Sequence, residues 1–245
     1  MFASPTDFKQ FVIEGELLLY CGPIVFLREG QPKPLSAESN GTFGLVDTGT
    51  KKLLVTCSHV WDGFWDYKQA NPSARIGVLL GAATPILLPE KPPIACDRDM
   101  DLAAFEVEEL LPYFTKRVFF PVQSFPIRQV REKDIVAFLG YPGKGKRLSK
   151  YVGDFQYSSF GFSVTSVGKH GFVIHRGEGK RHLVDNSGQT IDDFELKGIS
   201  GSPCYKLSSS LKPSLVGFVK EGKTSDGSIF VAHASFIQSD GTLRT

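Results

Sequence analysis

The stretch LLVTCSHV at residues 53–60 decides the fold, because an apolar run ends there in a turn that carries His59. Val, Ile, Phe and Tyr favour strands, and short runs rich in these residues recur along the chain. Between the runs lie turns rich in glycine and proline, of which the chain has 25 and 15. This spacing is typical of an all-β barrel or sandwich. The predicted strands are residues 17–20, 24–27, 42–46, 52–56, 76–80, 102–107, 135–139, 171–174, 214–219 and 228–232. Helical turns are expected near residues 6–12, after His59 and at residues 234–238.

The overall composition is that of a globular protein. A content of 41% hydrophobic and 22% charged residues excludes a disordered chain, a coiled coil and a collagen-like fibre. With 28 Lys and Arg against 26 Asp and Glu, the chain is too balanced in charge for a typical nucleic-acid-binding protein. The best apolar stretch, residues 11–27, is interrupted by charges and by Gly22-Pro23, so no membrane helix is expected.

Location and domain organisation follow from similar patterns. The N-terminus lacks the pattern of a signal peptide, and the four cysteines are widely dispersed, so we expect a cytoplasmic protein with unpaired thiols. Residues 110–133 contain three prolines and charges at both ends, which is typical of a connection between two halves. The 245 residues therefore divide into an expected N-terminal domain, residues 1–120, and a C-terminal domain, residues 121–245.

Two further patterns supply groups that could act with His59. Asp101 ends an acidic turn and directly precedes the apolar run 102–107. Ser200 lies between glycines in GISGSP, residues 198–203. A serine hydroxyl is a poor nucleophile unless a histidine takes its proton and a carboxylate orients that histidine. The three residue types together therefore predict nucleophilic acyl transfer.

Each pattern by itself has a simpler interpretation. A serine flanked by glycines is often only a turn, a histidine beside a strand is often packed or at the surface, and an aspartate before a strand is often a solvated turn residue. Other residues of the same types lie nearby and stay open as alternatives: Asp97 and Asp99 for the acid, Ser58 and Ser202 for the hydroxyl. Neither of these two serines has glycine on both sides.

Nucleotide and metal binding are the other chemical classes to weigh. Residues 217–224, GFVKEGKT, formally match a phosphate-binding loop, and residues 140–147 miss that pattern only at the last position. Such a loop needs a helix after it, but residues 225–227 predict a turn and residues 228–232 a strand. Cys57 and His59 are close in sequence, but no four-ligand set accompanies them. We therefore expect neither a metal nor a cofactor.

The motifs together resemble those of the trypsin-like (chymotrypsin-fold) serine peptidases, nearer the disulfide-poor bacterial and viral members. The chain order His59, Asp101, Ser200 matches this class, whereas α/β-hydrolases run Ser, acid, His and subtilisins run Asp, His, Ser. The resemblance covers most of the chain, from about residue 41 to residue 232. It rests on GTFG (41–44), LVTCSHV (54–60), DLAAF (101–105), LGYP (139–142), GISGSP (198–203) and, most loosely, GFVKEG (217–222).

The resemblance implies a fold and a role for each site residue. The fold would be two six-stranded antiparallel Greek-key β-barrels with the active site in the cleft between them. Ser200 would attack a polypeptide substrate, His59 would be general base and then acid, Asp101 would orient His59, and the amides of Gly198 and Ser200 would form the oxyanion hole. Substrate would bind along a set of residues on both sides of that turn: Phe194, Glu195, Leu196, Lys220, Glu221 and Gly222. Which side chain is accepted before the cleaved bond stays open.

Two questions of activity and control stay open. The chain could be an inactive trypsin-like module that binds peptides or partners, although all three catalytic positions are filled. Digestive members carry Asp before the nucleophile, where it pairs with a new N-terminal ammonium. Ile199 stands there and cannot hold a buried charge, which argues against that route of activation. The resemblance implies that the oxyanion turn is ordered either constitutively or by a regulatory protein partner.

Overall fold

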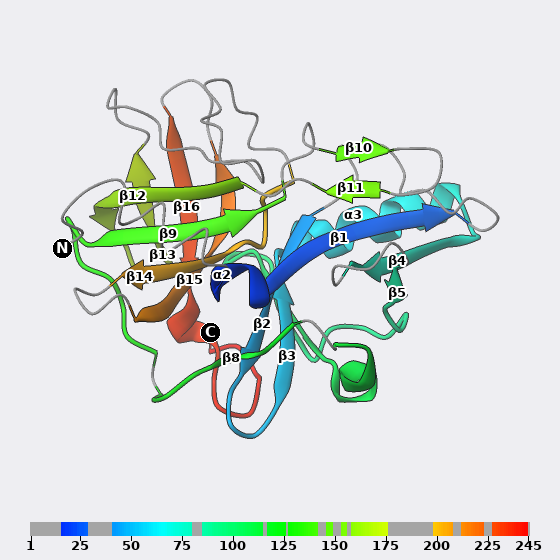
Figure 1. Cartoon of the computed structure of the whole chain (residues 1–245), viewed down its shortest axis with the longest axis horizontal. Coiled ribbons are helices and arrows are strands. Elements are labelled where there is room, and N and C mark those ends of the chain that lie inside the picture. Colours follow the sequence, from blue (N-terminus) through cyan, green and yellow to red (C-terminus); the bar gives the residue numbers. More distant parts are fainter. Residues whose placement is uncertain are drawn as a thin grey trace.

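The protein is mostly β, with one closed six-stranded barrel and a second sheet. The structure is a computed structural model that describes residues 16–28, 41–79, 85–114, 117–125, 127–141, 146–148, 153–155, 158–175, 198–207, 212–222 and 227–244. Figure 1 shows the barrel strands on the left and the second sheet with its helix on the right.

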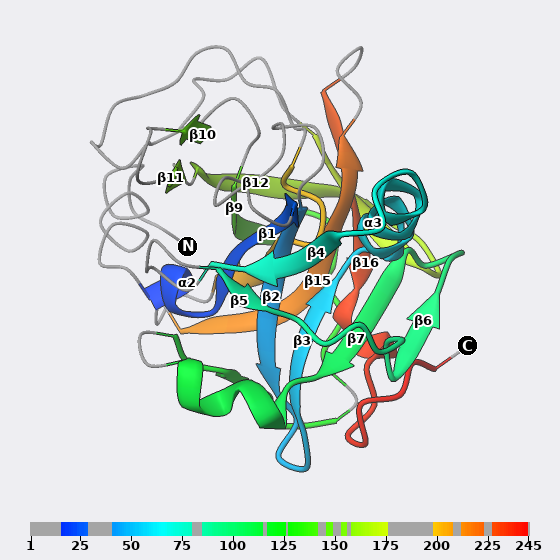
Figure 2. The same ribbon diagram turned by 90° about the vertical axis from the view of Figure 1, so that its right-hand side faces the viewer.

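The second sheet is built from the N-terminal part of the chain. Its strands lie in the order β5 (Ile86–Leu87), β4 (Ala74–Val78), β1 (Cys21–Arg28), β2 (Gly41–Asp47), β3 (Lys52–Thr56), β7 (Leu102–Glu106) and β6 (Ala95–Asp97). These pairs are antiparallel, and β8 (Phe120–Pro121) adds a short parallel pair to β2. Figure 2 shows β3, β7 and β6 following one another toward one side of the molecule.

The two outer strands of this sheet, β5 and β6, belong to one segment, residues 86–97. One end of the segment pairs with β4, and Leu88 N–H donates to Ile76 O at 2.9 Å. The other end pairs with β7, and Ile94 N–H donates to Ala104 O at 2.8 Å. Between these ends lie prolines 89, 92 and 93, which have no N–H to donate. The segment therefore spans from one edge of the sheet to the other without pairing in its middle.

The closed barrel contains six antiparallel strands. In order around it they are β12 (Ser158–Val167), β13 (Gly171–His175), β16 (Ser228–His233), β15 (Pro213–Gly222), β14 (Pro203–Leu207) and β9 (Ile135–Gly140), which pairs again with β12. A separate hairpin joins β10 (Lys146–Leu148) and β11 (Gly153–Phe155). Closure leaves these six strands without a free edge.

Among the described residues, three clusters of buried side chains hold these parts together. One fills the inner side of the second sheet and includes Phe43, Phe64 and Trp61. Another fills the barrel and includes Phe138 and Ile199. The third is shared, because it joins residues of the second sheet, the barrel strands and the short helix α2 (Glu16–Leu19). The two β parts are therefore packed against each other through a common apolar layer.

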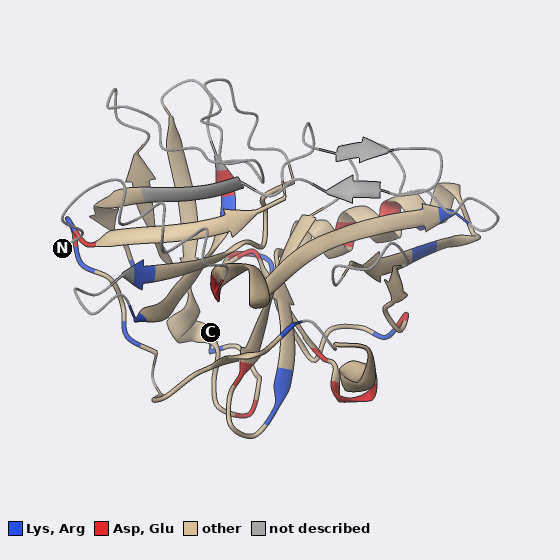
Figure 3. Ribbon diagram, in the orientation of Figure 1, with Lys and Arg blue, Asp and Glu red and all other residues tan. Residues whose placement is uncertain are grey.

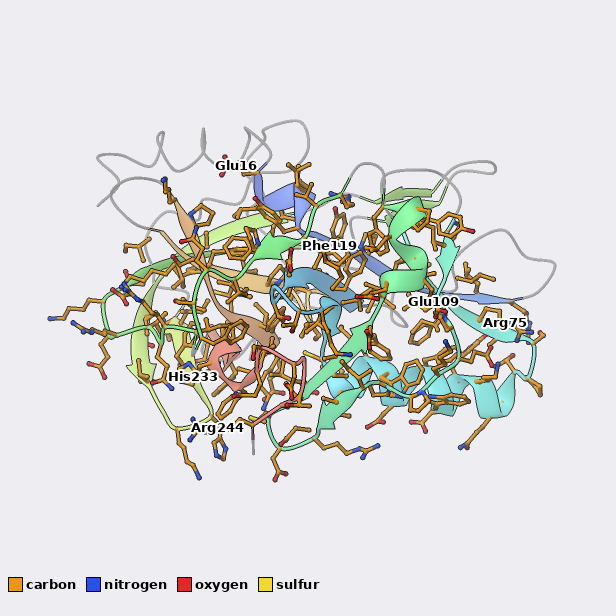
Figure 4. All side chains as sticks on the ribbon, turned by 90° about the horizontal axis from the view of Figure 1, so that it is seen from below. Glu16, Arg75, Glu109, Phe119, His233 and Arg244 are labelled. Carbon is orange, nitrogen blue, oxygen red and sulfur yellow. The ribbon has the colours of Figure 1, made fainter. Side chains whose placement is uncertain are left out.

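Helices are few in the described residues. The longest, α3 (Ser58–Ala70), buries Val60, Trp61 and Phe64 on one face. Short 3-10 helices are η2 (Glu108–Tyr113) and η4 (Ala234–Phe236), and Figure 4 labels Glu109 on the first and His233 beside the second. None of the described helices has the length and apolar character needed to span a bilayer.

Nine of the ten predicted strands overlap strands of the structure, one is wrong, and the barrel strands β12 and β14 were not predicted. Residues 17–20 were expected as a strand but lie in or next to helix α2, whose Leu17 is buried in the shared core. The run Leu17-Leu18-Leu19 suits a helix as well as a strand, and packing against the barrel decides between them. The turn after His59 is correct in position but extends to the 13 residues of α3, and the turn at 234–238 corresponds to η4. The turn expected at residues 6–12 lies outside the described residues.

Candidate active site

His59 is positioned by the junction of a strand and a helix. Strand β3 ends at Thr56, Cys57 has an extended backbone, and helix α3 begins at Ser58. His59 is therefore in the first turn of the helix, where its neighbours Ser58 and Val60 are buried. Its own side chain is 52% exposed, so the imidazole is open to solvent on one side.

Asp101 lies against His59 in a turn just before β7. Its carboxylate accepts three hydrogen bonds: from His59 Nδ1 to Oδ2 at 2.8 Å, from His59 N–H to Oδ1 at 3.0 Å, and from Ser58 Oγ to Oδ1 at 2.9 Å. Burial alone would raise the pKa of Asp101, but the hydrogen bonds from His59 and Ser58 and the charge of His59 hold that pKa below its ordinary value. An ionised Asp101 accepts at both oxygens, so His59 carries a proton on Nδ1 and leaves Nε2 for chemistry.

The turn that carries Asp101 is strained and held from several sides. Asp101 has a φ of 56°, in the left-handed region that non-glycine residues rarely adopt. Met100 N–H donates to Asp97 Oδ1 at 2.8 Å, and Arg98 forms two hydrogen bonds to Asp62 of α3 at 2.9 and 3.0 Å. The acidic alternatives Asp97 and Asp99 make no hydrogen bond to His59, so Asp101 is the acid that the turn presents to the imidazole.

Lys220 ties this turn to the barrel. The pairing of β15 with β16 shifts register between Val219 and Glu221, which leaves Lys220 at a bulge. A bulge turns a side chain out of the regular alternation. Lys220 Nζ reaches across and donates to Asp99 O at 3.1 Å. A residue expected to bind substrate thus also contacts the turn of Asp101.

The turn that carries Ser200 directly precedes the barrel strand β14. Gly198 and Gly201 have φ of 93° and 89°, and the Ile199 side chain between them is fully buried in the barrel core. Ile199 O accepts from Ser202 N–H at 2.9 Å and from Ser202 Oγ at 2.6 Å. A Cβ at position 201 would lie 2.1 Å from Thr42 O and 2.4 Å from Thr56 Oγ1, so only glycine fits there.

Thr42 of β2 connects the second sheet to this turn. Thr42 N–H donates to Ser200 O at 2.8 Å, and Thr42 Oγ1 donates to Gly198 O at 2.9 Å. Tyr141 N–H donates to the same hydroxyl oxygen at 3.1 Å. The Thr42 carbonyl in turn accepts from Thr56 Oγ1 at 2.7 Å. This fully buried threonine therefore binds both ends of the segment that carries Ser200.

The predicted residues come together to different degrees. Ser200 O lies 3.3 Å from where a Cβ on Gly41 would be, and that Cβ would also touch Val60, the neighbour of His59. Ser200 and Val60 therefore both border Gly41, but no hydrogen bond joins the side chains of Ser200 and His59. Among the described residues, none accepts a hydrogen bond from the amides of Gly198 and Ser200.

The predicted substrate-binding residues are only partly described. Phe194, Glu195 and Leu196 lie outside the described residues. Lys220, Glu221 and Gly222 form the end of β15, with Glu221 exposed.

The strand continues through residue 222 and β16 begins at Ser228, so the helix that nucleotide binding would need is not formed by residues 228–233.

One grouping of potential metal ligands was found in the part of the chain that the structure describes. Cys57 Sγ, a ring nitrogen of His59 and a carboxylate oxygen of Asp101 all lie within 4.8 Å of one another. Burial raises the pKa of the Cys57 thiol well above its ordinary value, and the Asp101 carboxylate raises it further. A thiol held protonated is a poor metal ligand, and it donates instead to Val219 O at 3.1 Å.

Two positioning residues were missed from the sequence. Ser58 was considered only as an alternative nucleophile, whereas the structure places its hydroxyl on the Asp101 carboxylate. Thr42 was noted only as part of a motif. A buried hydroxyl must have a hydrogen-bond partner, but the sequence does not say which group on a distant segment supplies it.

The charges around this region are mixed rather than of one sign. Figure 3 shows acidic residues on helix α3 and both basic and acidic residues among the described strands and loops. Near His59 they include the Arg98–Asp62 pair, Asp99 and Lys220.

Comparisons with known proteins find no family and no curated relative that matches the chain. Many solved structures are similar to the chain, among them two that match over most of both chains. One is described by the statement that aromatic interactions drive the coupled folding and binding of the intrinsically disordered Sesbania mosaic virus VPg protein; it is 13% identical with a TM-score of 0.48, over 88% of this chain and 87% of that chain. The other is human heparin binding protein, 11% identical with a TM-score of 0.49, over 95% of this chain and 89% of that chain.

Proposed function

We propose that the protein is a serine endopeptidase of the trypsin-like class that cleaves polypeptides through an acyl-enzyme on Ser200. The observation that carries the proposal is the His59–Asp101 pair, with Nδ1 to Oδ2 at 2.8 Å. The turn of Ser200, with glycines at 198 and 201, is bonded to strand β2 of the same sheet through Thr42. An ionised carboxylate that fixes one nitrogen of a partly exposed imidazole is the arrangement that general-base catalysis requires.

The proposed reaction begins with attack of Ser200 Oγ on the carbonyl carbon of the peptide bond, while its proton passes to His59 Nε2. The carbonyl oxygen becomes an oxyanion, which the amides of Gly198 and Ser200 stabilise. Collapse breaks the C–N bond, and the leaving amine takes the proton from His59. Water then attacks the ester on Ser200 by the same route and releases the acid. Asp101 stays ionised throughout, in keeping with its lowered pKa.

We further propose that the second sheet is also a six-stranded Greek-key barrel, with the active site in a cleft between the two. Support comes from the segment 86–97, whose ends pair with β4 and β7. If β5 and β6 are two ends of one strand, the sheet has six strands and closes on itself. The proposed domains, residues 1–120 and 121–245, would meet at β8. Substrate would extend along the end of β15, at residues 220–222.

The test is covalent labelling combined with hydrolysis. A fluorophosphonate probe should modify Ser200, located by peptide mapping, and labelling should disappear in Ser200→Ala. His59→Ala and Asp101→Asn should each lower kcat by about three orders of magnitude or more, because the three groups act together. A metal chelator should leave activity unchanged. Hydrolysis that survives Ser200→Ala would refute the proposal, and absence of labelling in a folded protein would favour an inactive binding module.

A further inference from the structure

The hydroxyl of Thr42 forms a hydrogen bond to the turn that carries Ser200, residues 198–202, which is named the oxyanion turn below. It donates to Gly198 O at 2.9 Å and accepts from Tyr141 N–H at 3.1 Å, so both hydrogen-bonding capacities of this buried group are used. The backbone of the same residue donates to Ser200 O at 2.8 Å. One residue of the second sheet thus holds the carbonyls on both sides of Ile199.

These carbonyls fix the peptide units on either side of the one that carries the Ser200 amide, and so restrict the conformations of the turn. The Gly198 carbonyl belongs to the peptide that joins Gly198 to Ile199, and the Ser200 carbonyl follows the proposed nucleophile. Both glycines of the turn have positive φ, and glycine has the widest choice of backbone conformations. Without an external partner, such a turn has several accessible conformations. Together with the bonds from Ser202 to Ile199 O and from Gly201 N–H to Val219 O, the two bonds from Thr42 favour the conformation in which Ile199 enters the barrel core.

We infer that Thr42 is a positioning residue that keeps the oxyanion turn ordered at all times, so that the site needs no activating partner. This inference rests on the proposed function, and it concerns the control of the same site. The buried side chain at position 199 is apolar and offers no charge to an ion pair that could order the turn. The ordering contacts come instead from a neutral hydroxyl and an amide on β2, which are present in the folded chain itself.

The experiment compares Thr42→Val, which removes only the hydroxyl, with Thr42→Ser, which keeps it. Thr48→Val is the matched control, because Thr48 is also buried, donates from Oγ1 to Ser239 O at 2.7 Å and accepts from Lys51 N–H at 3.0 Å. Folded protein is quantified for each variant by gel filtration and by its tryptophan fluorescence, and kcat is expressed per folded molecule. This separates misfolded protein from folded protein with a misplaced turn.

We expect Thr42→Val to lower kcat per folded molecule by about 10- to 100-fold with little change in KM, since small misplacement of reacting groups costs that much. In Thr42→Ser and Thr48→Val, kcat should stay within about twofold of the parent. An unchanged kcat per folded molecule in Thr42→Val overturns the inference. If Thr42→Val does not fold, Thr42→Ala is measured in its place and judged in the same way.

A separate readout distinguishes failure of the inference from failure of the proposed function. If the parent protein neither hydrolyses peptides nor reacts with the probe, the proposed function is wrong. Hydrogen exchange of the Gly201 and Ser202 amides then decides the inference, because these amides bond to Val219 O and Ile199 O only when the turn is ordered. Faster exchange in Thr42→Val than in Thr42→Ser supports the inference that the Thr42 hydroxyl orders the turn, and equal exchange in the two variants overturns it.

Discussion

Replacement of Gly201 by alanine should be among the most damaging single-methyl changes in the protein. The new Cβ would lie 2.1 Å from Thr42 O, 2.4 Å from Thr56 Oγ1 and 3.0 Å from Thr56 Cα. Two of these are backbone atoms, and the third belongs to a hydroxyl that is bonded to Thr42 O. Side chain and backbone must therefore move together, and the φ of 89° at this position is itself unfavourable for alanine.

Alanine substitutions at two other glycines separate the backbone effect from the packing effect. Gly49 has a φ of 84° with no atom within 4 Å of an added Cβ, so Gly49→Ala measures the backbone effect alone, about 1 kcal/mol of destabilisation. Gly63 lies in helix α3 with equally open space, so Gly63→Ala should stabilise by about 0.5–1 kcal/mol. Gly201→Ala adds overpacking of about 1–3 kcal/mol to the backbone effect, which gives about 2–4 kcal/mol in total.

The assay is denaturant unfolding of the three variants and the parent, followed by the fluorescence of Trp61 and Trp65. The free energy of unfolding should fall in the order Gly63→Ala, parent, Gly49→Ala, Gly201→Ala. Probe labelling of Ser200 should be lost in Gly201→Ala only. A Gly201→Ala protein as stable as Gly49→Ala would refute the idea that the turn is packed rigidly against Thr42 and Thr56.

Three further outcomes are expected. A thiol reagent should modify the exposed Cys96 in the native protein and spare three buried thiols, whose pKa values burial raises, in Cys21 to about 12; modification of a second thiol without unfolding would contradict this. Burial lowers the pKa of His233, whose ring is bonded to Gly168 O, so the free energy of unfolding should decline as pH falls below the ordinary value of 6.5, and the decline should be weaker in His233→Phe. Ser58→Ala removes a hydrogen bond to a charged carboxylate, and kcat/KM should fall by about tenfold, with Ser58→Thr restoring most of it; equal activity in Ser58→Ala would show that Asp101 needs no such support.

Strands with a continuous apolar run were predicted from the local sequence, whereas a strand without such a run was missed. Strands β3 and β7 are continuous apolar runs, and both were predicted nearly to their ends. Strand β12 was missed because SSFGFSVTSV contains four serines and a glycine, and it becomes a strand through its pairing with β9 and β13. Such long-range pairing also closes the barrel, where Phe138 of β9 lies opposite Cys204 of β14. Contacts between residues so far apart leave no local pattern.

The site residues also differ in how far the local sequence predicts them. The contact between His59 and Asp101 agrees with motifs that can be recognised one at a time. The roles of Ser58 and Thr42 depend on which distant carboxylate or carbonyl each hydroxyl meets, and that is settled only by packing. Serine and threonine are common at strand ends and helix starts for purely local reasons, so their presence there carried no signal.

The proline-broken segment at residues 86–97 has a consequence for the behaviour of the protein in concentrated solution. Open sheet edges offer rows of unpaired amides on which a second molecule can add its own strand, the first step toward aggregates. Here the two outer strands are only two and three residues long, and the residues between them include prolines at 89, 92 and 93. A neighbouring molecule therefore finds no continuous row of donors on this segment. Replacing these prolines would restore such a row, so the same residues that interrupt pairing within the molecule also protect it from unwanted pairing with another copy.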